Sequence, residues 1–134
     1  MTSTAPLLIQ RQGSIVTLQF NRPEAFNALN VELAQEFAAA MRTLSAAQGL
    51  SALVLQGAGK GFVAGGDLAT LQANPTQGAK DLLEPLIEAA TLMHQLHAPI
   101  IAQVHGAVAG AGLSLMMLCD FVLAAQGTRM NLAY

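Results

Sequence analysis

Two glycine-rich segments are the places where this chain could do chemistry. Residues 60–68 read KGFVAGGDL and residues 106–112 read GAVAGAG, and each follows a short apolar run rich in β-branched residues. The second segment leads into an apolar stretch without a charge until Asp120, so it places a row of backbone N–H groups at the start of a helix. Donors from two loops can stabilise one oxyanion, which makes acyl-group chemistry the leading hypothesis.

Three other glycine-based motifs fail when they are compared letter by letter. A phosphate-binding P-loop requires Ser or Thr after its Gly-Lys pair, and Gly61 stands there instead. A dinucleotide-binding fingerprint would have Phe62 or Leu115 in place of its last glycine, depending on where it starts. A nucleophile elbow around Ser114 would have Met116 in place of its last glycine. Nucleotide binding and a serine-hydrolase triad are therefore not supported.

The histidines and the single cysteine give no further reactive centre. His94 and His97 have i, i+3 spacing, but no third ligand lies within reach along the sequence, so no metal site is expected. Cys119 is the only cysteine, which excludes an intrachain disulfide. Its place between Leu118 and Asp120 at the end of an apolar stretch predicts a buried, unreactive thiol.

Apolar patterning predicts strands that alternate with helices. Strands are expected at residues 7–10, 14–20, 52–56, 100–104 and 121–124, the first two joined by a hairpin turn at Gly13. Helices are expected from 31 to about 48, from 68–71 onward as a short helix, from about 80 to 96, and at 111–118, with residues 57–66 as a loop. Asn30 is the expected N-cap of the first helix. The alternation favours an α/β fold with parallel strand pairing.

Composition limits the class of protein. A chain of 134 residues is long enough for one domain with a real core. Its residues are 53% hydrophobic and only 10% charged, whereas soluble domains carry about 25% charged residues. We therefore expect it to bury surface against a second copy or against a missing C-terminal part. The net charge of −2, with scattered Lys and Arg, predicts neither nucleic-acid nor anionic-membrane binding.

A membrane helix and secretion are also not expected. Residues 89–119 lack Asp, Glu, Lys and Arg, a run longer than the roughly 20 residues that span a bilayer. Pro99 and the glycines Gly106, Gly110 and Gly112 break this run into a strand, a turn and a helix. The first residues lack a basic region followed by an apolar one, so a cytoplasmic location is the default expectation.

Four segments together resemble one known family. Residues 62–68, FVAGGDL, are similar to the F-x-A-G-x-D-[LI] loop of the crotonase superfamily of enoyl-CoA hydratases and isomerases. Residues 21–29, NRPEAFNAL, resemble its N-R-P-x-x-x-N-A-[LM] segment, and residues 99–106, PIIAQVHG, resemble its P-[VI]-I-A-x-[VI]-x-G strand. Residues 109–112, AGAG, followed by Cys119 and Asp120, resemble its G-G-G helix start and closing C-D pair. The motifs keep the family's order and spacing over nearly the whole chain.

The resemblance implies a fold, a substrate and an assembly. The family fold is a spiral of repeated ββα units that assembles as trimers or dimers of trimers. Family chains are about twice as long as this one, so residues 1–134 resemble the N-terminal part of a single crotonase-like domain that lacks its C-terminal part. The substrate would be an acyl-CoA thioester, with no cofactor and no metal ion.

The resemblance also implies site residues by position. Gly66 and Ala111 correspond to the two family positions whose backbone N–H groups form the oxyanion hole. Asp67 would orient its loop rather than react. The positions that would bind coenzyme A and the acyl group are Glu24, Ala25, Asn27, Ala64, Gly65, Gly66, Asp67, Leu68 and Gly110.

Departures from the family pattern bear on the reaction. Ser114 stands where family hydratases carry their first catalytic glutamate, and Tyr134 corresponds to the second. Neither side chain activates water well near neutral pH, so hydration by two glutamates is in doubt and double-bond or ring isomerisation of an enoyl-CoA is the leading hypothesis. The alternatives are an enoyl-CoA hydratase (lyase) that recruits its water differently, or a truncated, non-catalytic assembly protein.

Overall fold

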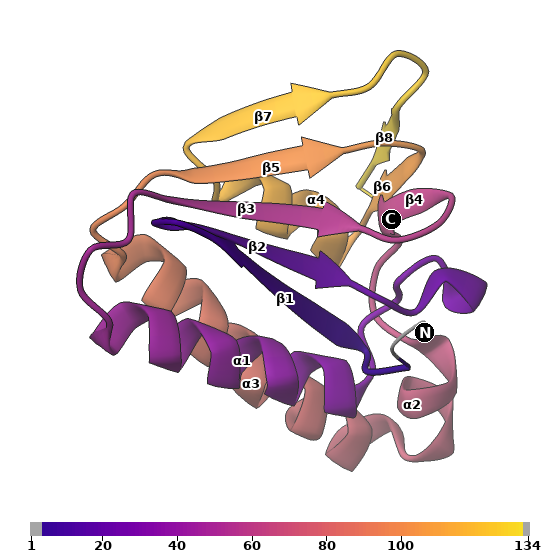
Figure 1. Ribbon diagram of the computed structural model, residues 1–134. Helices are drawn as coiled ribbons and strands as arrows, with labels where there is room; N and C mark the ends of the chain where they lie inside the picture. The colour runs from indigo at the N-terminus through magenta and orange to yellow at the C-terminus, as the bar shows by residue number, and fades with distance from the viewer. Residues whose placement is uncertain (1–3, 133–134) are drawn as a thin grey trace.

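Five strands form the larger sheet of the computed structural model, which describes residues 4–132 (Figure 1). β1 (Leu7–Gln12) and β2 (Ile15–Phe20) form the expected antiparallel hairpin. β3 (Ala52–Gly57), β5 (Ile100–Val104) and β7 (Phe121–Ala124) then pair in parallel, giving the order β1-β2-β3-β5-β7. The α/β class and the parallel pairing are confirmed.

A second, smaller sheet corrects the sequence prediction. β4 (Gly61–Val63), β6 (Ala107–Ala109) and β8 (Arg129–Asn131) pair in parallel beyond the ends of β3, β5 and β7 (Figure 1). The interpretation of residues 57–66 as loop throughout was wrong at β4, and β6 and β8 were not predicted. A three-residue strand is too short to show an alternating pattern, and these strands pair only with segments distant in the sequence.

The helices begin where capping residues place them. α1 (Val31–Ala46) has the predicted N-cap, since the Asn30 side chain accepts a hydrogen bond from Leu33 N at 2.9 Å. The short helices are η1 (Pro23–Ala25), α2 (Leu68–Ala73) and α4 (Ala111–Met117), and α4 contacts β4 and β6 of the smaller sheet. α1 and α4 end slightly earlier than predicted.

The longest helix, α3 (Pro75–Gln95), starts five residues before the predicted boundary near residue 80. Asn74 caps this helix by accepting a hydrogen bond from Gln77 N, and Pro75 is its first residue, a position where proline is tolerated. Gly78 does not interrupt the helix. A Cβ there would lie 2.4 Å from the carbonyl oxygen of Thr70, so this glycine allows α2 and α3 to pack closely.

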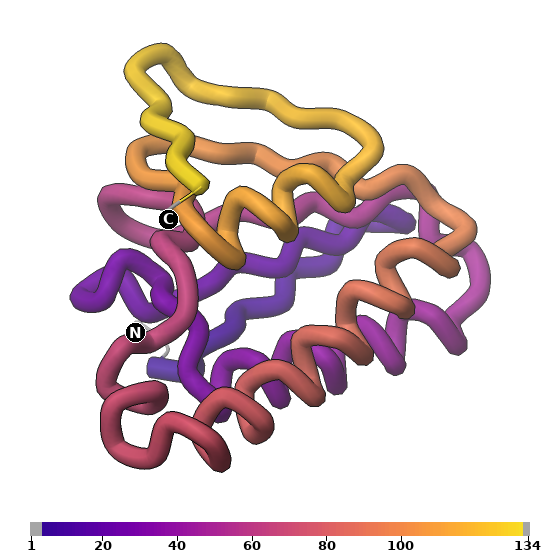
Figure 2. Tube along the Cα trace, turned by 180° about the vertical axis from the view of Figure 1, so that it is seen from behind, coloured from indigo at the N-terminus to yellow at the C-terminus, as the bar shows by residue number. Residues whose placement is uncertain are grey.

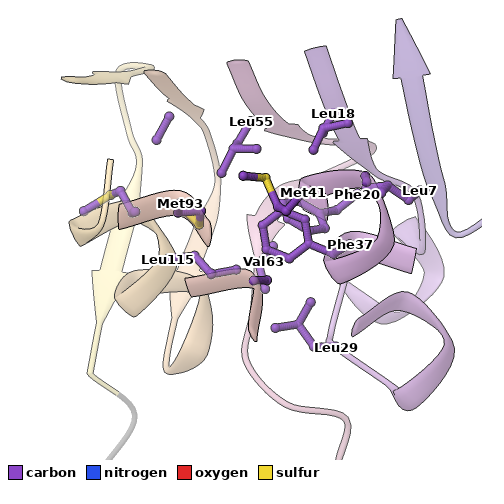
Figure 3. Close-up of a cluster of buried hydrophobic side chains, with 14 of the residues drawn as sticks. Leu7, Leu18, Phe20, Leu29, Phe37, Met41, Leu55, Val63, Met93 and Leu115 are labelled. Atoms are coloured by element: carbon purple, nitrogen blue, oxygen red, sulfur yellow. The ribbon is translucent and has the colours of Figure 1, made fainter. Parts of the chain in front are cut away.

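The core lies between the larger sheet and the helices that cover one of its faces. α1 and α3 run side by side in the view from behind, with α4 beside them (Figure 2). Phe20 contacts Phe37 edge to face, with ring centroids 5.2 Å apart (Figure 3). It contacts Phe62 in the same way, with ring centroids 5.8 Å apart. Along these strands, residues on the buried face of the sheet alternate with residues on its other face. The residues on the buried face are Val16, Leu18, Phe20, Leu53, Leu55, Ile100, Ala102 and Val104.

Apolar side chains remain exposed near the last strands. Phe121 and Leu123 on β7 are both 62% exposed, and Met117 at the end of α4 is 70% exposed. These exposed apolar side chains are consistent with the low content of charged residues. That a second copy or a missing C-terminal part covers them stays a prediction. Within residues 4–132, no helix is long and apolar enough to cross a bilayer.

Candidate functional site

The first glycine-rich loop is tied to the chain segment that precedes α1. Ala64 N donates to the carbonyl of Phe26 at 3.0 Å, and Leu29 N donates to the carbonyl of Gly65 at 2.8 Å. Asp67 N in turn donates to the carbonyl of Leu29 at 2.9 Å. These three backbone hydrogen bonds fix the position of the loop relative to the start of α1.

The Asn27 side chain contacts the chain segment that leads into this loop. It is fully buried, and its Nδ2 lies 2.9, 3.0 and 2.9 Å from the carbonyl oxygens of Ala58, Gly61 and Phe62. Its Oδ1 accepts a hydrogen bond from Arg22 N at 2.7 Å. The resemblance placed Asn27 along the coenzyme A site, but its side-chain polar atoms are all used inside the protein. It therefore acts by positioning the loop.

Asp67 caps α2 from the end of the same loop. Its Oδ2 accepts from the N and Oγ1 of Thr70 at 3.1 and 2.9 Å, and its Oδ1 lies 3.6 Å from Nη1 of Arg22. Burial acts to raise the pKa of Asp67, but the Thr70 hydrogen bonds and the Arg22 guanidinium together hold that pKa below its ordinary value. These contacts tie the carboxylate to Thr70 and Arg22, and its expected role in orienting the loop stays a prediction.

The start of α4 sits directly on the end of β4. A Cβ at Gly112 would lie 2.0 Å from the carbonyl oxygen of Val63, so only glycine allows this approach. Gly110 N donates to the carbonyl of Asn131 at 3.0 Å, which links the turn to β8. The second glycine-rich segment is thereby brought next to the first, because Val63 immediately precedes the first loop.

The two predicted oxyanion donors share a local geometry. Gly66 follows Gly65, which has φ of +124°, and Ala111 follows Gly110, which has φ of +53°. Such positive φ angles favour glycine, so each predicted donor follows a backbone turn that other residues rarely adopt. Among the described residues, neither Gly66 N nor Ala111 N donates a hydrogen bond within the chain. Both donors are free to bind a ligand.

An open pocket of about 600 Å³ brings most of the predicted site residues together. Its lining combines the first loop, the segment after η1 and the turn before α4. The lining residues are Ala25, Ala28, Ala64, Gly65, Gly66, Asp67, Leu68, Ala69, Leu71 and Gly110. Ala28, Ala69 and Leu71 were not predicted, although Ala28 lies within the quoted segment 21–29 and the other two follow the quoted segment 62–68.

Two predicted residues lie beside this pocket rather than in it. Glu24 lines a separate pocket with Arg22 and Asn30. Ala111 opens into a neighbouring apolar groove between α3 and α4, with a volume of about 170 Å³. The residues that line this groove are Leu29, Leu86, Ile87, Ala90, Ala111, Ser114, Leu115 and Leu118.

The remaining candidate side chains do not form a catalytic group. Ser114 Oγ lies 3.4 Å from the carbonyl oxygen of Gly110, a long contact within its own helix. Burial, followed by the charge of Asp120, raises the pKa of Cys119 to about 12, so its thiolate is suppressed near neutral pH. In the part of the chain that the structure describes, no three His, Cys, Asp or Glu side chains gather to hold a metal ion. Tyr134 lies outside the described residues.

Comparisons with known proteins agree on one family. The sequence profile described as enoyl-CoA hydratase/isomerase matches residues 10–134. A Bacillus subtilis protein named as an enoyl-CoA hydratase/isomerase is 40% identical over 113 residues, which are 84% of this chain and 44% of that relative. The 1,2-epoxyphenylacetyl-CoA isomerase of Escherichia coli is 33% identical over 96% of this chain and 50% of its own length.

A solved structure supports the same grouping. The crystal structure of an enoyl-CoA hydratase from Mycobacterium smegmatis superposes with a TM-score of 0.90 at 35% identity. The match covers 95% of this chain and 50% of that one. The chain therefore spans about half the length of the relatives that it matches.

Replacing Asn27 tests its positioning role. Asn27→Asp keeps the shape but removes both N–H donors and places a carboxylate against three carbonyl oxygens, so the free energy of unfolding should fall by about 3 kcal/mol or more. Asn74→Ala, which removes an exposed helix cap, is the control and should cost about 1 kcal/mol. Urea denaturation measures both. Equal, small losses in the two variants would contradict the role given to Asn27.

The lowered pKa of Asp67 predicts a pH-dependent contribution to stability. A depressed carboxyl pKa stabilises the fold above the unfolded value of about 3.9, and this contribution is lost as pH falls below it. Asp67→Asn should therefore reduce the free energy of unfolding by about 0.5–1 kcal/mol at pH 7, and the difference should shrink as pH falls through the lowered pKa. Thr70→Val, which removes only the hydroxyl donor, should show a smaller effect. A difference that stays constant from pH 7 to pH 3 in urea denaturation would exclude this linkage.

Proposed function

The chain belongs to the enoyl-CoA hydratase/isomerase family, and from this premise we propose that the protein binds an acyl-CoA thioester and stabilises its enolate. The observation that carries the proposal is that the N–H groups of Gly66 and Ala111, on adjacent glycine turns, donate to no group within residues 4–132. When a base removes a proton from the α-carbon, the electron pair moves to the thioester oxygen, and two N–H donors stabilise the negative charge there.

Isomerisation fits the described residues better than hydration by two carboxylates. Asp67 is the single carboxylate on the pocket lining, and its oxygens are occupied by Thr70 and Arg22. Ser114 lies at the position where the family pattern has a glutamate. Isomerisation requires one base that removes a proton from one carbon and returns it to another. We place this base in a segment outside the chain, whose relatives are about twice its length.

Coenzyme A binding is assigned to the pocket beside the first loop. Ala25, Leu68 and residues 64–67 line this pocket, and Glu24, which immediately precedes Ala25 in the sequence, lines a separate pocket. No metal ion or further cofactor enters the proposed reaction. For the whole protein we propose a cytoplasmic location. We also propose that it assembles as trimers or dimers of trimers, and the exposed apolar side chains on β7 support this assembly.

An assembly protein without catalysis is the second candidate. The apolar face of α1 is buried in the chain's own core, but α3 exposes Leu83 and Ile87, and β7 exposes both of its faces. Such surfaces are typical of protein contacts. Unlike the enzyme, this candidate needs no affinity for a thioester.

A turnover assay tests where the catalytic base lies, independently of the oxyanion donors. The 134-residue chain should not isomerise a 3-enoyl-CoA, because it lacks a free carboxylate at the described site. A longer version of the protein that carries the missing carboxylate should do so. The assay is absorbance of the conjugated product. Isomerisation by the 134-residue chain itself would contradict the placement of the base.

Ala111→Pro tests the second donor directly. Ala111 is the first residue of α4, where proline is tolerated, and Gly110 has φ 53° and ψ −123°, the mirror image of an extended conformation that glycine can adopt before proline. The carbonyl ¹³C resonance of bound [1-¹³C]butyryl-CoA should move downfield from its free position. The variant should lose about half of this displacement, because one of two donors is removed.

Val31→Pro is the matched control, since it places proline at the first position of α1, outside the pocket lining. It should leave the carbonyl displacement unchanged. Equal displacement in the Ala111→Pro variant and the wild type would exclude Ala111 as a donor. Absence of thioester binding in all forms would favour the assembly protein.

A further inference from the structure

The apolar groove between α3 and α4 lies next to the proposed thioester site. Its walls are formed by Leu86, Ile87 and Ala90 from α3 and by Leu115 and Leu118 from α4, and Leu29 forms its floor. We propose that this groove binds the acyl group of the thioester and selects an uncharged, apolar group of about six carbons, an inference that rests on the proposed function.

Shared backbone connects the groove to the site. Gly110 lines the pocket, and the next residue, Ala111, lines the groove. Leu29 lines the groove, and its backbone forms hydrogen bonds with Gly65 and Asp67, the two residues that flank Gly66. Ala111 therefore lines the groove itself, and the two residues that flank Gly66 are hydrogen-bonded to Leu29, which also lines it. A thioester oxygen at these donors places the acyl carbons at the mouth of the groove.

The chemistry of the groove excludes a charged acyl end. Among the residues that the structure describes, its lining contains no charged side chain, and Ser114 alone contributes a polar side chain. A carboxylate at the far end of the acyl group would lose its hydration without gaining a cationic partner. The groove therefore discriminates between a hydrocarbon and a dicarboxylic acyl group of equal length.

The size of the groove sets the approximate length of the acyl group. Its volume of about 170 Å³ is close to that of an apolar protein cavity of about 150 Å³ that is known to hold benzene. A six-carbon chain or ring fits such a space. Ile87 and Leu118, which are 62% and 42% exposed, form a rim that a bound apolar group would cover.

The other large apolar cavity does not compete for this role. It has a volume of about 310 Å³ and lies between β1 and α1, where Ile9 and Ala39 line it together with Arg11 and Glu36. None of its lining residues belongs to either glycine-rich segment. It provides a matched place for a control substitution.

Affinities for three thioesters test the inference. The 134-residue chain is titrated by calorimetry with acetyl-CoA, hexanoyl-CoA and hexanedioyl-CoA. Each buried methylene strengthens binding about fourfold, so partial burial of four additional carbons should make hexanoyl-CoA bind at least about tenfold more tightly than acetyl-CoA. Hexanedioyl-CoA, which has the same length and a terminal carboxylate, should bind about tenfold or more weakly than hexanoyl-CoA.

Filling the groove should remove this preference. Ala90→Phe should bring the ratio of hexanoyl-CoA to acetyl-CoA affinity close to one, and Ala90→Leu, a milder change, should reduce it in part. Ala39→Phe, which fills the cavity beside β1, should keep the wild-type ratio. Amide NMR spectra of each variant establish that it is folded before its affinities are compared.

The outcomes distinguish a failure of the groove assignment from a failure of the proposed function. Equal affinity for acetyl-CoA and hexanoyl-CoA, or for hexanoyl-CoA and hexanedioyl-CoA, would overturn the groove assignment alone and would leave the groove as a surface for protein contacts. Failure to bind any thioester, acetyl-CoA included, would contradict the proposed function, and the groove assignment would fall with it.

Discussion

The buried amide of Asn27 is the contact on which the geometry of the site depends. It joins the carbonyls at the end of β3 and along β4 to the backbone of Arg22, and both Phe26 and Asn27 have positive φ angles of 52° and 58°. A bulky residue such as Phe26 adopts this conformation at a cost, which the surrounding hydrogen bonds must offset. The turn that results presents the carbonyls to which the first glycine-rich loop is bonded.

The two glycine turns owe their proximity to packing rather than to sequence neighbourhood. β4 and β6 are adjacent parallel strands, and each leads into one of the turns. Gly112 lets α4 approach the end of β4 until no side chain fits between them. Gly66 thereby lines the pocket and Ala111 lines the apolar groove, and their two peptide N–H groups are the donors that we propose. Such preorganised donors stabilise developing charge without reorganising during the reaction.

The sequence predicted the parts of this structure that depend on local patterns. The hairpin at Gly13, the Asn30 cap and the strand at residues 100–104 follow from turn chemistry, capping and β-branched runs. The smaller sheet could not be predicted, because three-residue strands acquire their identity only by pairing with distant segments. The same limit applies to the site. Motifs located its loops, but the buried role of Asn27 and the groove between α3 and α4 depend on tertiary packing.

The most direct test of the account asks whether Gly66 and Ala111 donate to the same thioester oxygen. The ¹⁵N-labelled chain would be titrated with butyryl-CoA and, as the control, with coenzyme A, which lacks the carbonyl group. The account predicts that both amide protons move downfield together with butyryl-CoA, with one common saturation curve, and that neither does so with coenzyme A. A downfield shift of only one of them, or the same shifts with coenzyme A, would contradict the two-donor site.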